Sequence, residues 1–135
     1  MIFTKLSGSK ENKNVIKYLI KWKSKSRSKF QQEVKFFLYP FWKGHVVYEE
    51  FPVVGTKMTL DFVNLTSRIA IEVQGSQHSE YNKFFHGKEA NNYYNQLHRD
   101  LEKKRWCELN KITLVEIHPK DLPLTKKFLE ELGVI

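Results

Sequence analysis

Hydrophobic and polar positions along the chain follow two periods, and each period predicts one kind of element. Apolar residues three and four positions apart indicate helices, whereas short apolar or alternating runs bounded by turn residues indicate strands. The expected helices span residues 28–42, 91–110 and 124–133, and the expected strands span residues 45–54, 58–64, 68–74 and 111–118. The predicted order is therefore α-β-β-β-α-β-α.

This order predicts an α/β (α+β) fold with a central mixed β-sheet of about four strands and helices on its faces. A hairpin followed by a helix crossover to another strand requires such a mixed sheet. Ser28 is the expected cap of the first helix, and Pro40 is its expected end. Residues 1–27 are expected to form a basic arm or a short helix, ahead of a single domain of residues 28–135.

The hairpin at the centre of the chain brings two acidic residues together. If residues 65–68 form the turn, Asp61 lies directly opposite Glu72, with their Cβ atoms about 4.5–5.5 Å apart. Gln74 points to the same side as Glu72, because side chains alternate along a strand. The opposite side of the hairpin collects an apolar set, which consists of Leu60, Phe62, Ile69, Ile71 and Val73.

Two carboxylates with no basic residue between them repel each other, and a divalent cation relieves that repulsion. Mg²⁺ takes carboxylate oxygens as ligands and keeps several waters. The pair therefore predicts a metal site, with Gln74 and His78 in the same cleft. Plainer interpretations stay open, because acidic residues at strand ends are often solvated and a register slip of one residue would separate the pair. A lone histidine after a glycine turn is also often structural.

Charge changes the picture for the first third of the chain. The 135 residues carry a net charge of +8; residues 1–45 hold 11 Lys/Arg against 2 Asp/Glu, and residues 46–135 hold 12 against 13. The densest stretch, residues 17–29, alternates bases with serines and contains Tyr18 and Trp22. Such a segment suits nucleic acid, because ammonium groups replace phosphate counterions and aromatic rings stack on bases. A solvated arm and, more weakly, an anionic membrane surface are the alternatives.

The residues expected to contact nucleic acid lie in this stretch and on the helix of residues 91–110. They are Lys17, Lys21, Lys23, Lys25, Arg27, Lys29, Lys103 and Lys104. For the two helical lysines, a solvated helix face is an equal alternative. The single Cys107 excludes an internal disulfide and a multi-cysteine zinc site, and no apolar run reaches the ~18 residues of a membrane span. We therefore expect a cytoplasmic protein that does not enter a membrane.

Further motifs complete a series along the chain. A helix with an acidic residue precedes "LDF", then "IEVQGSQH", then a helix with "HRDLEKKRW". The five residues of the series are Glu33, Asp61, Gln74, His78 and Asp100. This series resembles the restriction-endonuclease-like PD-(D/E)XK superfamily, and more closely its branch around very-short-patch repair endonucleases and phage homing nucleases with an EDxHD signature. The resemblance covers roughly residues 28–118.

The resemblance implies a divalent-metal-dependent DNA endonuclease, of phage or mobile-element origin, that uses Mg²⁺ or Mn²⁺ to hydrolyse phosphodiester bonds. Asp61 would be the main metal ligand, and the backbone carbonyl of Val73 would be another. Glu72 or Gln74 would complete the shell. The substrate would be duplex or branched DNA, with RNA left open. Cutting both strands would need a homodimer or two successive nicks.

The other residues of the series have supporting roles in this interpretation. His78 would orient or deprotonate the attacking water, or protonate the leaving oxygen. Glu33 and Asp100 would hold waters of the metal or His78 itself. Glu49 and Glu50 are alternatives to Glu33. For Asp100, a surface ion pair with the lysine four positions on is the plain interpretation.

The chain departs from the family pattern at two points. The superfamily often has lysine two residues after the strand glutamate, where this chain has Gln74, which can position water or bind a metal but cannot act as a base. The repair endonucleases of this branch usually hold a structural zinc, which one cysteine cannot support. An inactive nucleic-acid-binding module on the same fold is therefore an alternative, as is an interaction protein whose basic arm binds an acidic partner.

Overall fold

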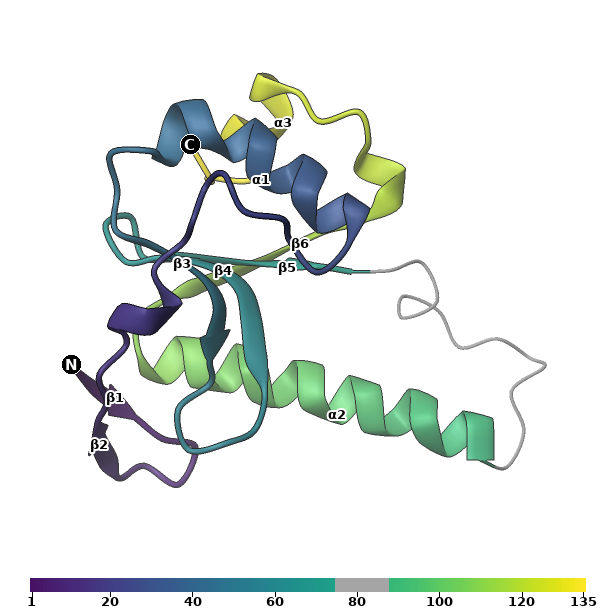
Figure 1. Ribbon diagram of the computed structural model, residues 1–135. Helices are drawn as coiled ribbons and strands as arrows, with labels where there is room; N and C mark the ends of the chain where they lie inside the picture. The colour runs from purple at the N-terminus through teal and green to yellow at the C-terminus, as the bar shows by residue number, and fades with distance from the viewer. Residues whose placement is uncertain (75–87) are drawn as a thin grey trace.

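The computed structural model describes residues 1–74 and 88–135. A mixed sheet of four strands forms the centre of this structure (Figure 1), and its strands are, in spatial order, β3 (Val47–Pro52), β4 (Thr59–Asn64), β5 (Ile69–Val73) and β6 (Thr113–Ile117). Neighbouring strands from β3 to β5 are antiparallel, whereas β6 runs parallel to β5. The parallel pair requires a crossover, which includes the helix α2 (Lys88–Leu109).

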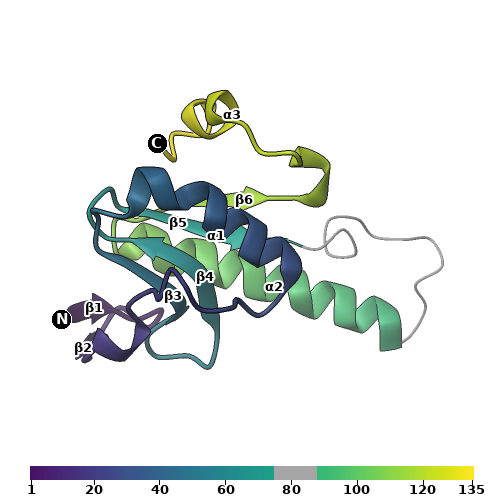
Figure 2. The ribbon, with the colours of Figure 1, turned by 45° about the horizontal axis from the view of Figure 1, so that its top comes forward.

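Helices cover both faces of the sheet. The helices α1 (Lys29–Trp42) and α3 (Lys126–Glu131) lie on one face, and α2 lies on the other, as Figures 1 and 2 show. The predicted fold class and the order α-β-β-β-α-β-α are confirmed for these elements. Within residues 1–74 and 88–135, the structure contains no helix whose length and apolarity would let it cross a membrane.

The helix ends follow the expected signals with one exception. The Ser28 side chain accepts a hydrogen bond of 3.1 Å from the backbone N–H of Gln31, as expected of a cap. Pro40, however, lies inside α1, which continues to Trp42, so the expected end was wrong. Proline removes only the N–H that would bind the carbonyl of Phe36, and the side chain of Phe36 is on the exposed side of the helix, where water can bind that carbonyl.

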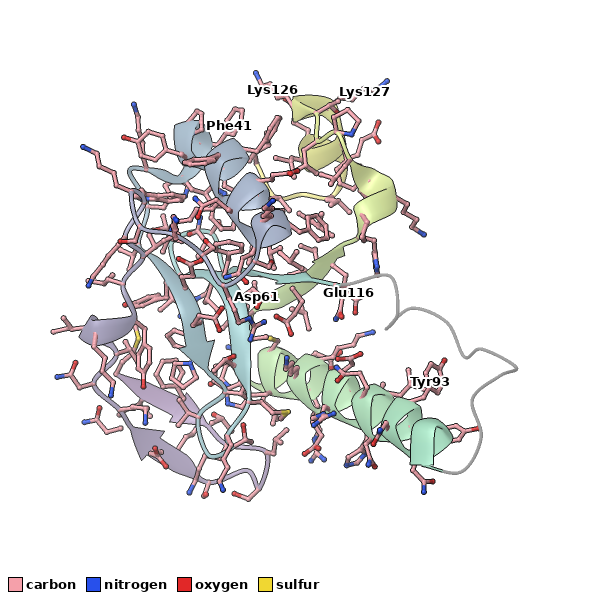
Figure 3. All side chains as sticks on the ribbon, turned by 45° about the vertical axis from the view of Figure 1, so that its right-hand side comes forward. Phe41, Asp61, Tyr93, Glu116, Lys126 and Lys127 are labelled. Atoms are coloured by element: carbon pink, nitrogen blue, oxygen red, sulfur yellow. The ribbon has the colours of Figure 1, made fainter. Side chains whose placement is uncertain are left out.

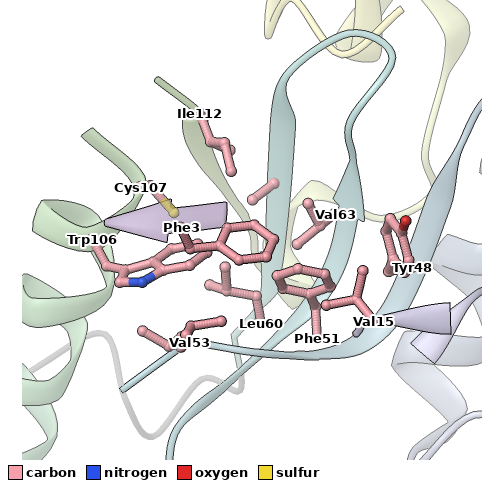
Figure 4. Packing of buried hydrophobic residues seen from close by; sticks show 12 residues of the cluster. Phe3, Val15, Tyr48, Phe51, Val53, Leu60, Val63, Trp106, Cys107 and Ile112 are labelled. Atoms are coloured by element: carbon pink, nitrogen blue, oxygen red, sulfur yellow. The ribbon is translucent and has the colours of Figure 1, made fainter. Parts of the chain in front are cut away.

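The first 27 residues form more than the expected basic arm. They contain a hairpin of β1 (Ile2–Thr4) and β2 (Lys10–Asn12) and a short 3₁₀ helix, η1 (Ile16–Tyr18). Phe3 is buried in the core, where its ring stacks on Trp106 at 5.8 Å between centroids and meets Phe51 edge-on (Figure 4). Strands of three residues are too short to show a period in the sequence. The N-terminal segment therefore belongs to the core of the domain.

Two apolar clusters sandwich the sheet, and the alternation between them is interrupted at Asp61. Phe62 packs against the α1 side, whereas Leu60 and Val63 both pack in the cluster that contains Trp106 of α2. Leu60 therefore lies on the opposite side from Phe62, contrary to expectation. Glu50, which stands opposite Asp61 in the β3–β4 register, has a φ of 52°. Both strands deviate from a regular pleat at this position.

Candidate active site

The two central carboxylates lie side by side, as predicted. The register that pairs Phe62 with Ile71 brings Asp61 opposite Glu72, and the two residues are only 4% and 5% exposed. A carboxylate oxygen of Glu72 accepts the backbone N–H of Asp61 at 3.0 Å, and Asp61 Oδ2 accepts the backbone N–H of Val73 at 2.7 Å. Each carboxylate is thus held in place by the backbone of the opposite strand.

Two cations meet this pair, contrary to the expectation that no basic residue lies between the carboxylates. Lys103 Nζ lies 2.5 Å from Glu72 Oε1, and Arg27 Nη2 lies 3.3 Å from Asp61 Oδ1. Lys103 comes from the side of α2 that faces the sheet, and its side chain is only 16% exposed. Lys103 therefore does not lie on a solvated face of the helix, and while it is paired with Glu72 its ammonium is not available to nucleic acid. The sequence did not reveal these partners because they come from remote elements.

The environment of Asp61 favours its protonated form. Burial, followed by the charge of Glu72, raises the pKa of Asp61 from 3.8 to about 7. The hydrogen bond from Val73 lowers this pKa, and the charge of Glu50 raises it further. Asp61 is therefore partly protonated near neutral pH, and a cation that binds there displaces a proton.

Glu50, and not Glu33, is the acidic residue that lies next to Asp61 on the β3 side. Arg27 lies between Glu50 and Asp61, with Nη1 at 3.7 Å from Glu50 Oε2. The amide of Gln31, on the buried face of α1, donates to Glu50 at 3.0 Å. Glu33 is exposed and lies on a different face of the same helix. The structure therefore places the alternative acid, Glu50, beside Asp61, whereas Glu33 lies on the exposed side of α1.

Glu49 belongs to an adjoining network, which is linked to Glu50 through Gln31 and supports the loop before α1. Its carboxylate accepts hydrogen bonds from Lys35 Nζ at 2.8 Å, from Ser26 Oγ at 2.6 Å and from the amide of Gln31 at 2.9 Å. Lys35 is fully buried, and no motif in the sequence marks it as a functional residue. A lysine at an apolar helical position was its only sequence signal.

The remaining predicted residues are distributed around this centre. Gln74 is buried, and its backbone N–H donates to the carbonyl of Ile117 at 2.9 Å. Asp100 accepts a hydrogen bond of 2.9 Å from the side chain of Gln96. Among the ion pairs of the described residues, the expected pair between Asp100 and Lys104 is absent. His78 lies outside the described residues.

A groove lies between α2 and β6, and one of its lining residues, Glu116, is the strand neighbour of Glu72. Asp100 and Lys104 line it from the helix, and Glu116 and His118 line it from the end of the strand. The parallel register sets Glu116 directly beside Glu72, and Figure 3 shows Asp61 and Glu116 along the region between the sheet and α2. His118 Nε2 lies 3.1 Å from Glu116 Oε2. The neighbours of His118 and Glu116 could not be predicted from the sequence, because the phase of a crossover strand cannot be read from the chain.

The basic residues before α1 surround two adjoining hollows. Four of them line the first hollow, and Lys17 and Lys21 join Lys25 and Arg27 around the second, which reaches Glu49 and Glu50. The members of the first set are Lys23, Lys25, Arg27 and Lys29. The predicted nucleic-acid residues of this segment are therefore gathered on one side, next to the carboxylates.

The donor atoms around Asp61 and Glu72 suit a small divalent cation. Mg²⁺ is usually bound through one or two carboxylates and retains several waters, and the amide oxygen of Gln74 is a further hard donor. No group of three or more His, Cys, Asp or Glu side chains within the described residues is arranged to hold a metal. A cation here would therefore depend on the two carboxylates, with water and neutral oxygens completing its coordination.

Comparisons with known proteins give one relative and no family. No family model matches the chain, and no solved structure matches it. The chain is 37% identical over 82 residues to the uncharacterized protein 033L of Invertebrate iridescent virus 3. The match covers 60% of this chain and 41% of the viral protein, so the chain spans about two fifths of that relative's length. The chain is thus similar to a viral protein whose name carries no activity.

Proposed function

We propose that the protein is a divalent-metal-dependent endonuclease that hydrolyses DNA phosphodiester bonds beside Asp61 and Glu72. The supporting observation is that two carboxylates, each about 5% exposed or less, face each other at the point where two strands diverge from their regular pairing. Burying two like charges together is costly, and the raised pKa of Asp61 reflects that cost. A bound divalent cation would turn this arrangement into a favourable one.

The side chains around the pair have complementary roles in this reaction. A divalent cation supplies Lewis acidity toward the phosphate and lowers the pKa of a water nucleophile. Asp61 and Glu72 hold the cation, and Asp61 gives up its proton when it does so. Gln74 orients water through its amide. Arg27, whose side chain is 68% exposed, is free to turn from Asp61 toward a phosphate oxygen.

Lys103 supplies the basic group that the family pattern places at position 74, where this chain has glutamine. The resemblance leads one to expect a lysine at position 74, and this chain has glutamine there. The ammonium of Lys103 reaches the same glutamate from α2 at 2.5 Å. A cation beside Glu72 is therefore present, although it comes from another element.

A catalytically inactive module that binds nucleic acid is the alternative. It is favoured by the fact that Arg27 and Lys103 already neutralise the two carboxylates. If these ion pairs are permanent, the site has no room for a metal, and the basic segment alone would act on nucleic acid. The likeness to a viral protein supports a viral or mobile-element source in either case.

A cleavage assay separates these two functions. Supercoiled, linear, single-stranded and four-way-junction DNA, together with a single-stranded RNA, are incubated with the protein and Mg²⁺ or Mn²⁺, and with EDTA as a control. We expect metal-dependent nicking that Asp61→Asn reduces on the order of 10³-fold. Glu131→Gln, a change of the same kind at an exposed residue of α3, should leave the rate unaltered. Binding without cleavage across this panel would establish the alternative.

A further inference from the structure

The loop before α1 and the first turns of that helix line an open cavity of about 500 Å³. Four basic side chains line it, together with Phe36 and small polar residues. The basic residues are Lys23, Lys25, Arg27 and Lys29. No acidic residue of the described chain lines this cavity, so its walls form one positive surface. Its volume lies within the range of pockets that hold a small organic ligand.

Hydrogen bonds to α1 and β3 fix the shape of this loop. Lys35 Nζ donates to the backbone carbonyl of Ser24 at 2.9 Å. The backbone N–H of Ser26 donates to the side chain of Gln32 at 2.6 Å, and Ser26 Oγ donates to Glu49 at 2.6 Å. The loop is therefore organised before any ligand arrives, which reduces the entropy lost on binding.

Phe36 gives this basic cavity an aromatic wall. Its side chain is 64% exposed, although a phenyl ring gains most from burial. The neighbouring rings of Trp22 and Tyr39 face each other edge-on at 5.4 Å between centroids. Phe36 takes part in no such ring pair among the described residues. A ring left open beside four cations matches a ligand that carries both a phosphate and a flat base.

We propose that this cavity binds a nucleotide of a single-stranded nucleic acid, with its phosphate on the lysines and its base against Phe36. Base stacking on a side chain requires an unpaired base, which a regular duplex does not offer. Arg27 forms one wall of the cavity and also contacts Asp61, so a strand bound here continues toward the carboxylates. Only the course of the strand toward Asp61 and Glu72 rests on the proposed function; the binding of a nucleotide in the cavity does not.

Fluorescence anisotropy with the full chain in EDTA tests this site without cleavage. The probes are labelled oligothymidylate, oligouridylate, a duplex of equal length and heparin as a polyanion without stackable bases. We expect single strands to bind more tightly than the duplex. Phe36→Ala should weaken single-strand binding roughly tenfold and leave heparin binding unchanged. Phe36→Trp should retain it, because the indole also stacks.

Matched variants separate stacking from charge. Changing Lys23, Lys25 and Lys29 together to glutamine should weaken binding of every probe and reduce its salt dependence. The control changes the exposed lysines at 57, 111 and 127 to glutamine and has the same net charge. The ratio of the affinities for oligothymidylate and oligouridylate shows whether the site prefers DNA or RNA. These probes report binding alone, so a protein that binds as expected but does not cut would overturn the proposed function and leave this site intact.

Three results would overturn the proposal. The first is equal affinity for the duplex and the single strands. The second is unchanged single-strand binding by Phe36→Ala, or an equal loss caused by Leu101→Ala, a control change at an exposed residue of α2. The third is an equal loss of affinity in the two triple-lysine variants. Circular dichroism melts of each variant ensure that the proteins compared are folded.

Discussion

Two consecutive pairs of residues on the β4–β5 ladder are buried alike but held in opposite ways. Phe62 and Ile71 are fully buried, and they pack among the apolar side chains on the α1 side of the sheet. The next pair, Asp61 and Glu72, is almost as buried, yet it carries two like charges. Backbone N–H groups and two remote cations stabilise that second pair. The apolar pair therefore stabilises the fold, whereas the acidic pair is retained although burying its two carboxylates reduces the stability of the fold.

Truncating a side chain of the apolar pair should lower the stability of the fold strongly. Ile71→Ala removes a fully buried side chain and should lower the free energy of unfolding by about 3 kcal/mol, because it leaves a cavity among packed residues. Urea denaturation followed by tryptophan fluorescence measures this. An exposed control, Val46→Ala, should change stability by less than about 0.5 kcal/mol. Equal effects of the two changes would contradict the assigned core.

The acidic pair should be sensitive to the loss of its partner. Lys103→Met keeps most of the side-chain volume but leaves Glu72 buried without its cation, so we expect a loss of about 2 kcal/mol. Adding Mg²⁺ should restore part of that stability in the variant, because the metal replaces the ammonium. The measurement is a thermal melt with and without Mg²⁺. If Lys103→Met melts like the wild type, the ion pair does not stabilise the site.

A change of pH should affect the acidic pair and should not act on the apolar pair, which has no titratable group. The folded protein holds the Asp61 proton with a pKa of about 7, against 3.8 in the unfolded chain. The folded state therefore binds the extra proton between these values, and stability should fall as pH rises from about 4 to 7 and level off above 7.

Asp61→Asn isolates this contribution. The variant should be more stable than the wild type above pH 7 and should lose that advantage as the pH falls to 4. Its amide oxygen can still accept the N–H of Val73. Denaturation curves across this range measure the difference directly. A wild type that gains stability relative to the variant as the pH rises would show that Asp61 is stabilised in its charged form.

The sequence predicted the hairpin because its information is local. The turn of residues 65–68 sets the register, and with it the pair of Asp61 and Glu72. The positions of Lys103 and Glu116 depend on how a crossover helix and its strand dock on the sheet, which no local pattern encodes. The same holds for Leu60, whose side follows from the irregular backbone at Glu50. The elements were therefore predictable, and the partners around the site were not.

Residues 1–27 show the same limit from another direction. Their composition predicted a basic segment, and its charges do gather beside the carboxylates. Phe3 belongs to a run of three apolar residues at positions 1–3, and it is only 3% exposed, whereas Ile2 beside it is 67% exposed. A run of three residues is too short to show a period, so the burial of Phe3 becomes visible only with the fold. Charge density was thus a better guide to this segment than hydropathy.

The most direct test of the account is whether Asp61 and Glu72 bind one divalent ion. Isothermal titration with Mn²⁺ at pH 6 and pH 8, in two buffers of different ionisation enthalpy, reports stoichiometry, affinity and released protons. We predict one ion per chain, tighter binding at pH 8, proton release on binding at pH 6, where Asp61 is mostly protonated, and no binding at this site in Asp61→Asn. Equal Mn²⁺ binding by the wild type and Asp61→Asn at both pH values would contradict the central claim.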